Sequence, residues 1–201
     1  MNRVTRRATR EVPAVAVAAL AVAMMLFAAC ATTPPPGNPV QMTELAAPPS
    51  DGAPFQPMGE LLYSGGRSAG YDLYRVVGPR VNISYTKDGK WAGNLDGRDV
   101  WLTATPGKLK GAGVDLTLSS EGDKISIRGT WFQRRISLSM SPTALQGRAG
   151  VPAYDFTRTA PNLWSGPTPR GQAGLEARGD AQKFPDVPMP QFALALLAAL
   201  P

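Results

Sequence analysis

Between Tyr71 and Gly147 the chain alternates apolar and polar residues with a period of two. Successive side chains of a β-strand point to opposite faces, so each run predicts a strand with one buried and one solvated face. β-branched residues are frequent and helix-period spacing is absent. The apolar members, which we expect to face inward, are Val81, Ile83 and Tyr85; Val100, Leu102 and Ala104; Val114, Leu116 and Leu118; Ile125, Ile127 and Trp131; and Ile136, Leu138 and Met140.

Short turn signals separate these runs. Asp88-Gly89 and Asp96-Gly97 are typical of two-residue hairpins, because glycine supplies the positive φ that such turns need. Further turns are expected at 106–107, 121–123 and 132–135, and a bulge or tight bend at 111–113, where the apolar parity switches. Connections this short force neighbouring strands to be antiparallel. The sequence therefore predicts an all-β fold, an antiparallel meander of about seven or eight strands forming a small barrel or a two-layer sheet.

A weak repeat accompanies the alternation, with Leu-x-Gly or Ile-x-Gly ending at Gly97, Gly111, Gly129 and Gly147. The last three glycines are 18 residues apart, and a parallel β-solenoid also shows glycines at a steady period. The first interval is only 14 residues, and the hairpin dipeptides favour the meander.

The remaining parts of the chain differ in composition from this meander, which we place at residues 59–150. Residues 30–58 are rich in proline and predict a semi-rigid tether of up to about 85 Å. Residues 151–201 are expected to wrap the domain irregularly and to end in a short helix at about 190–200, where Phe192, Leu196 and Leu200 are one helical turn apart. The helix is expected to dock on the sheet or in a barrel mouth, the alternative being contact with a membrane or a partner.

The first thirty residues have the layout of an export signal. Arg3, Arg6, Arg7 and Arg10 precede an apolar run, residues 14–29, that ends in small residues before Cys30. This segment resembles the signal peptide and lipobox of bacterial lipoproteins, with Phe27 where that family usually has leucine. The resemblance covers residues 1 to about 31 only.

The resemblance implies removal of residues 1–29 and attachment of diacylglycerol and palmitate to Cys30, the only cysteine. Ala31 after the lipidated residue implies the outer membrane, with the domain on its periplasmic or cell-surface side. The membrane, reached through the acyl chains on Cys30, is then the first partner, and an envelope protein or lipid is the second. The alternatives are an uncleaved membrane helix, for which sixteen apolar residues are short, and ordinary cleavage after an Ala-x-Ala site.

Charge and composition restrict the function. Without residues 1–29 the chain carries 17 basic and 14 acidic residues and has no basic stripe interleaved with aromatic residues, so we expect no nucleic-acid binding. No histidine occurs, and Cys30 is assigned to acylation, which excludes Ser-His and Cys-His triads and typical zinc sites. We therefore expect no catalytic activity, cofactor or metal.

Three groups of charged residues are the weaker candidates for chemistry. Asp96 and Asp99 flank a turn and could be read as a carboxylate pair of the glycosidase kind, although Gly-Arg-Asp is ordinary turn sequence. Asp88, Glu121 and Asp123 fall at turns but lack the regular ligand series of a calcium loop. Arg134-Arg135 is expected to be a solvated pair at a hairpin.

Trp101 is the candidate binding residue. It occupies the wet face of its strand, between Val100 and Leu102, where the parity predicts a polar side chain. Exposed aromatic residues on a Ser/Thr-rich sheet stack on sugar rings or anchor a partner. The alternative is that the C-terminal segment covers Trp101, through Trp164 or Phe184, whereas Trp91 and Trp131 fall on apolar faces and are expected in the core.

Together these features predict a lipid-anchored envelope protein with a non-catalytic binding or structural β domain. The alternative is a carrier that encloses a lipophilic ligand in a lipocalin-like barrel. Small residues at Gly93, Ala104 and Gly129 are compatible with such a cavity.

Overall fold

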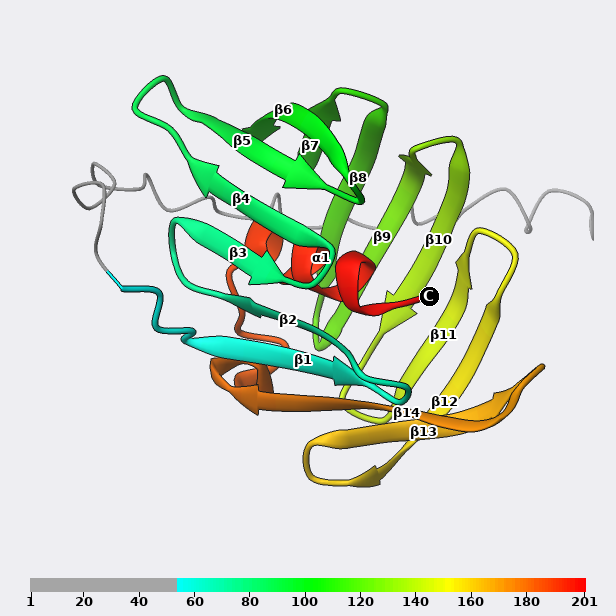
Figure 1. Ribbon diagram of the computed structural model, residues 1–201. Helices are drawn as coiled ribbons and strands as arrows, with labels where there is room; N and C mark the ends of the chain where they lie inside the picture. Colours follow the sequence, from blue (N-terminus) through cyan, green and yellow to red (C-terminus); the bar gives the residue numbers. More distant parts are fainter. Residues whose placement is uncertain (1–53) are drawn as a thin grey trace, which may run out of the picture. The chain divides into compact units, whose positions relative to one another are not determined.

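Within residues 54–201, the part that the computed structural model describes, fourteen antiparallel strands follow one another around a closed barrel (Figure 1). Each strand pairs with the next along the chain, and β14 pairs with β1 to close the ring. The strands are β1 (Gly59–Tyr63), β2 (Arg67–Tyr71), β3 (Arg75–Gly78), β4 (Val81–Tyr85), β5 (Lys90–Leu95), β6 (Arg98–Thr105), β7 (Lys108–Gly111), β8 (Val114–Glu121), β9 (Lys124–Trp131), β10 (Arg134–Met140), β11 (Ala144–Ala149), β12 (Ala153–Ala160), β13 (Leu163–Thr168) and β14 (Gly171–Gly179).

The all-β antiparallel class, the barrel and the C-terminal helix are as predicted, but the strand count of seven or eight is wrong. The chain between 151 and 179 was expected to be irregular and instead forms β12, β13 and β14. The barrel therefore extends well past residue 150. A solenoid is excluded by the antiparallel ladders.

The alternation between Tyr71 and Gly147 is confirmed by burial. Val81, Ile83, Leu116, Ile127 and Leu138, for example, are almost fully buried, whereas the residues between them along each strand are exposed or half-buried. Trp91 and Trp131 lie in the core as predicted. At 111–113 the structure has a tight bend, in which Gly111 pairs with Val114 across Ala112-Gly113, so the change of parity is a hairpin.

One series of glycines allows the strands to approach closely. Gly93, Gly111, Gly129 and Gly147 are spaced by 18 residues and have φ values of 141°, 141°, 138° and 119°. A Cβ atom at each would overlap a backbone carbonyl oxygen of the neighbouring strand. The structural repeat thus begins at Gly93 rather than Gly97, and its glycines bend the sheet where the barrel curves.

A short 3₁₀ helix, η2 (Asp180–Lys183), leads from β14 into α1 (Met189–Ala199), which lies inside the ring of strands (Figure 1). Ten of its eleven residues are buried, and Phe192 packs edge-on against Tyr71 of β2 with ring centroids 6.4 Å apart. A helix surrounded by protein is apolar all round, which explains the Phe192–Leu200 sequence. The predicted helix and its docking in the barrel are confirmed.

The barrel has two ends, which we call the mouth and the base. The mouth is the end where β1, β3, β5, β7, β9, β11 and β13 finish, and the base is the end where β1 begins. At the base, Gln191 near the start of α1 donates from Nε2 to the Leu73 carbonyl oxygen over 2.8 Å. At the mouth, Arg67 Nη1 donates to the carbonyl oxygen of Leu200, just after α1, over 3.3 Å.

Candidate functional site at the outer wall and the mouth

Trp101 projects from the outer wall of the barrel and is 63% exposed. Its strand, β6, turns Val100 and Leu102 into the core, so the intervening side chain must point to solvent. The other three tryptophans of the chain, Trp91, Trp131 and Trp164, are at most 1% exposed. The C-terminal segment does not cover Trp101, because Trp164 and Phe184 pack against each other instead, with ring centroids 6.4 Å apart.

The side chains beside the indole on the adjacent strands leave it exposed. Ala92 of β5 stands directly opposite Trp101 in the ladder and is small. On the other side, the β6–β7 ladder covers Thr103 to Thr105 of β6 and gives Trp101 no partner. The indole therefore has a small neighbour on one side and no ladder partner on the other.

Polar side chains lie one step along the strands from Trp101. Asn82, Asn94 and Asp99 are in register across β4, β5 and β6 and are all exposed. Asn94 donates from Nδ2 to Asp99 Oδ1 over 3.5 Å, and its Oδ1 accepts from the Gly97 backbone N–H over 3.1 Å. The row offers amide and carboxylate groups beside a flat apolar ring, a combination that suits polar ligands with an apolar face.

A hollow of about 250 Å³ lies between the β3–β4 and β5–β6 turns. Its polar lining is Arg80, Asn82, Asn94 and Asp96, so it shares Asn82 and Asn94 with the outer-wall row. The volume is below the range of about 300–1,000 Å³ typical of drug-sized ligand pockets, so the hollow suits a small chemical group.

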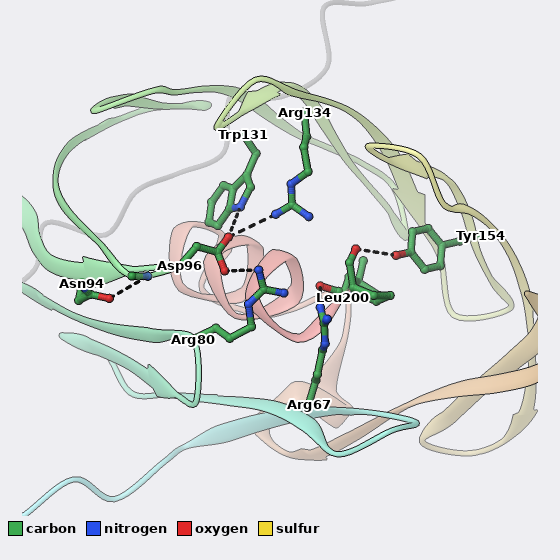
Figure 2. Close-up of polar contacts among 10 residues, drawn as sticks. Arg67, Arg80, Asn94, Asp96, Trp131, Arg134, Tyr154 and Leu200 are labelled. Atoms are coloured by element: carbon green, nitrogen blue, oxygen red, sulfur yellow. Dashed lines mark hydrogen bonds and ion pairs between the residues drawn. The ribbon is translucent and has the colours of Figure 1, made fainter. Parts of the chain in front are cut away.

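Asp96 is the centre of a polar cluster at the mouth (Figure 2). Its Oδ1 pairs with Arg80 Nη2 at 2.5 Å, and its Oδ2 accepts from Arg134 Nη2 and from Trp131 Nε1, both at 3.3 Å. The Asp96 side chain is 15% exposed, and those of Arg80 and Arg134 are 34% and 31% exposed. Two guanidinium groups thus share one carboxylate, which leaves positive charge in excess.

The sequence-predicted acidic groups are divided among different places. Asp96 and Asp99 have separate partners, the arginines of the mouth and Asn94 of the outer wall, and do not face each other as a carboxylate pair. Asp88 lies in the β4–β5 turn, whereas Glu121 and Asp123 lie at the β8–β9 turn. Between residues 54 and 201 no group of three acidic, histidine or cysteine residues is arranged to hold a metal ion.

Tyr154 of β12 completes the mouth beside the end of α1 (Figure 2). Its hydroxyl donates to the Pro201 carbonyl oxygen over 3.4 Å. Burial, with a smaller contribution from Tyr63, raises the pKa of Tyr154 to about 12, although Arg134 and Arg67 act in the opposite direction. The phenol is therefore neutral and a hydrogen-bond donor at physiological pH.

The sequence did not single out Arg67 or Arg80 as members of a cluster. The strand register brings together residues from 67 to 154 that are far apart in the chain, and no local pattern encodes this. The sequence does contain one signal for this cluster, because an arginine recurs at the turns. These arginines follow Gly66, Pro79, Gly97, Gln133 and Pro169.

The interior of the barrel is filled by its own side chains. The core joins inward residues of the strands to α1, including Leu61, Phe156, Trp164, Phe192 and Leu196, all 1% exposed or less. α1 therefore occupies space inside the barrel that a lipophilic ligand would need.

Cys30, Ala31 and the predicted tether up to residue 53 lie outside the described residues, so the lipid anchor stays a prediction. In the described part of the chain, no helix has the length and apolar character needed to cross a bilayer. Compared with known proteins, the chain matches no family model, no curated protein and no solved structure.

Proposed function

We propose that the chain is a lipid-anchored protein of the cell envelope whose barrel is a non-catalytic binding or structural module, and that it recognises its partner on the outer wall around Trp101. The observation that carries the proposal is the 63% exposed indole, which stands opposite the small side chain of Ala92. The other large aromatic side chains of the described strands are buried or half-buried, so this exposure is a local exception.

The exposed indole would contribute substantially to partner binding. A tryptophan side chain buries roughly 150–250 Å², so the exposed part of Trp101 corresponds to about 100 Å² or more. At about 25 cal/mol per Å², covering it is worth about 3 kcal/mol, which is typical of a residue that dominates an interface.

The filled interior supports recognition on the outside of the barrel rather than within it. The core includes α1 from Met189 to Ala199, so the surfaces that remain for a partner are the outer wall and the two ends. The lipobox resemblance supports the anchor on Cys30, and Ala31 supports the outer membrane. Residues 54–58 lie against the barrel, where the Met58 backbone N–H donates to the Tyr71 carbonyl oxygen over 2.8 Å. The predicted tether is therefore shortened to residues 30–53, and at up to about 70 Å it would still let the barrel reach partners at some distance from the membrane.

Replacement of Trp101 tests the binding surface. We expect Trp101→Ala to leave the unfolding midpoint unchanged but to reduce capture of the partner by crosslinking in the native envelope about 100-fold, the equivalent of about 3 kcal/mol. Arg128→Ala, on the exposed face of β9, is the control and should retain capture. Equal capture by both variants, or a large loss of stability in Trp101→Ala alone, would contradict the proposal.

The anchor has an independent test. Incorporation of a palmitate analogue should disappear in Cys30→Ser, and the processed protein should begin at residue 30. Labelling that persists in this variant would show that the fatty acid is elsewhere or that the lipobox interpretation is wrong.

A further inference from the structure

Five of the seven turns at the mouth each have an arginine in the turn or directly after it. We call these five residues the arginine rim. They are Arg67 after the β1–β2 turn, Arg80 in the β3–β4 turn, Arg98 after the β5–β6 turn, Arg134 after the β9–β10 turn and Arg170 in the β13–β14 turn. Asp96 is the one acidic residue in these turns and their flanking strand ends. The mouth therefore has a net side-chain charge of +4.

The base of the barrel has a different charge pattern. Its turns and flanking strand ends hold Asp72, Asp88, Glu121 and Asp123 against five basic residues, four of which are lysines. The base is nearly neutral, and the excess positive charge of the barrel ends is concentrated at the mouth. One residue further along the strands, Asp99, Arg135 and Arg148 together add a net charge of +1. Lys110 and Asp115 at the same level pair with each other at 3.6 Å and add none.

Four of the five rim arginines are held in place by other residues of the mouth. Arg80 and Arg134 share Asp96, and Arg67 donates to the carbonyl oxygen of Leu200. The guanidinium of Arg98 lies over the Phe132 ring, 5.1 Å from its centroid. Such planar groups match the oxygens of phosphate in a bidentate way, which lysine cannot do.

An apolar side chain protrudes from the same end. Val151, in the connection from β11 to β12, is 95% exposed and precedes Pro152. Basic residues combined with a projecting apolar side chain are typical of surfaces that lie on a membrane, where the cations meet headgroup phosphates and the apolar group enters the interface.

From this charge complementarity we infer that the mouth docks on a membrane surface that carries anionic phosphate headgroups. The inference goes beyond the proposed function, because it concerns the mouth rather than the outer wall at Trp101 and does not depend on acylation of Cys30. A barrel docked through its mouth would present the side wall with Trp101 to partners in the plane of the membrane.

The test uses the barrel, residues 54–201, whose strand pairing closes on itself and whose core is complete within this range. This fragment has no lipid anchor, so its co-sedimentation with vesicles reports the mouth alone. We expect binding to equimolar phosphatidylcholine–phosphatidylglycerol vesicles at low salt, little binding to phosphatidylcholine alone, and loss of binding at about 0.5 M salt, where screening is nearly complete. Equal binding to both vesicle types would overturn the inference.

Charge-matched variants localise the surface. Arg98→Gln with Arg170→Gln removes two rim charges that form no ion pair within residues 54–201. We expect about a fivefold loss of vesicle binding for each charge. Lys108→Gln with Lys124→Gln removes the same charge from the base and should leave binding nearly unchanged. An equal loss in both double variants would mean that net charge, and not the mouth, binds the vesicles.

Two further experiments identify the source of the phosphate and the end of the barrel that faces the membrane. Inorganic phosphate at millimolar concentration should not displace the barrel from vesicles, and full displacement would indicate a site for a soluble anion instead. An environment-sensitive dye on Val151→Cys should shift to the blue on vesicle addition, whereas the dye on Asp123→Cys at the base should not. Trp101→Ala should leave vesicle binding intact, so this inference and the proposed function fail separately.

Discussion

Asp96 has more polar partners than its position in a hairpin turn requires. Its φ of 54° suits asparagine as well as aspartate, so Asp96→Asn keeps the turn and removes only the charge. Arg80 and Arg134 would then face each other without a counter-charge, and we expect the free energy of unfolding to fall by about 1–2 kcal/mol in urea titrations.

The control for this change is Asp115→Asn. Asp115 pairs with Lys110 at 3.6 Å, but both side chains are well exposed, so the loss should stay within about 0.5 kcal/mol. If the two variants lose the same amount, Asp96 does not hold the mouth together.

Tyr154 makes the stability of the barrel depend on pH in the alkaline range. Its pKa is about 12 in the folded protein against 10.0 for an unperturbed phenol. Below pH 10 both states keep the proton and stability is unaffected, but between pH 10 and about 12 the unfolded state releases it first and stability falls. The melting temperature should therefore drop less steeply over this window in Tyr154→Phe than in the unchanged chain, and parallel curves would contradict the assignment.

At the residue scale, the alternation of apolar and polar residues predicted which side chains are buried, but not which residues contact each other across the barrel. The exposure of Trp101 and the burial of Trp91 and Trp131 follow from their places in alternating runs, because neighbours along a strand fix the face. The partners of Asp96 depend on a register that joins β3–β4, β5–β6 and β9–β10 turns, and a single sequence does not contain that information.

At the scale of strands, the close approach of neighbouring strands depends on the glycines at 93, 111, 129 and 147. A side chain at Gly129 would adopt a φ of 138° and overlap the carbonyl oxygen of Asp115 in β8. We expect Gly129→Ala to lower the free energy of unfolding by about 3 kcal/mol, measured by denaturant titration. Gly122→Asn is the control, because Gly122 has a φ of 59° and open space around it, and it should cost no more than about 1 kcal/mol. Similar losses in both variants would remove the argument for close strand approach.

Eleven strands, β1 to β11, lie within the predicted meander at 59–150, where about seven or eight were expected, and β12 to β14 lie beyond it. In β14 the inward residues are Ala173, Leu175 and Ala177, and in β2 they include Ala69, so small residues weaken the apolar signal there. η2 packs against β14 and α1 packs against β2, where small side chains leave room for a close approach. The apolar alternation is therefore weak in β2 and β14, the strands against which α1 and η2 pack.

At the scale of the whole molecule, the closed ring of strands and the helix inside it limit where a partner or ligand can bind. Pairing of β1 with β14 leaves no free edge among the strands of residues 54–201, and α1 lies in the interior that a carrier would need for its ligand. We therefore propose that recognition takes place outside the barrel, at Trp101 and at the arginine rim.

Native mass spectrometry of the protein purified from the envelope in mild detergent tests this claim most directly. We predict the mass of the polypeptide from Cys30 plus its covalent acyl chains, with nothing bound in the interior. A stoichiometric lipid that survives release of the detergent and is lost only when the barrel unfolds would contradict the account and indicate a carrier.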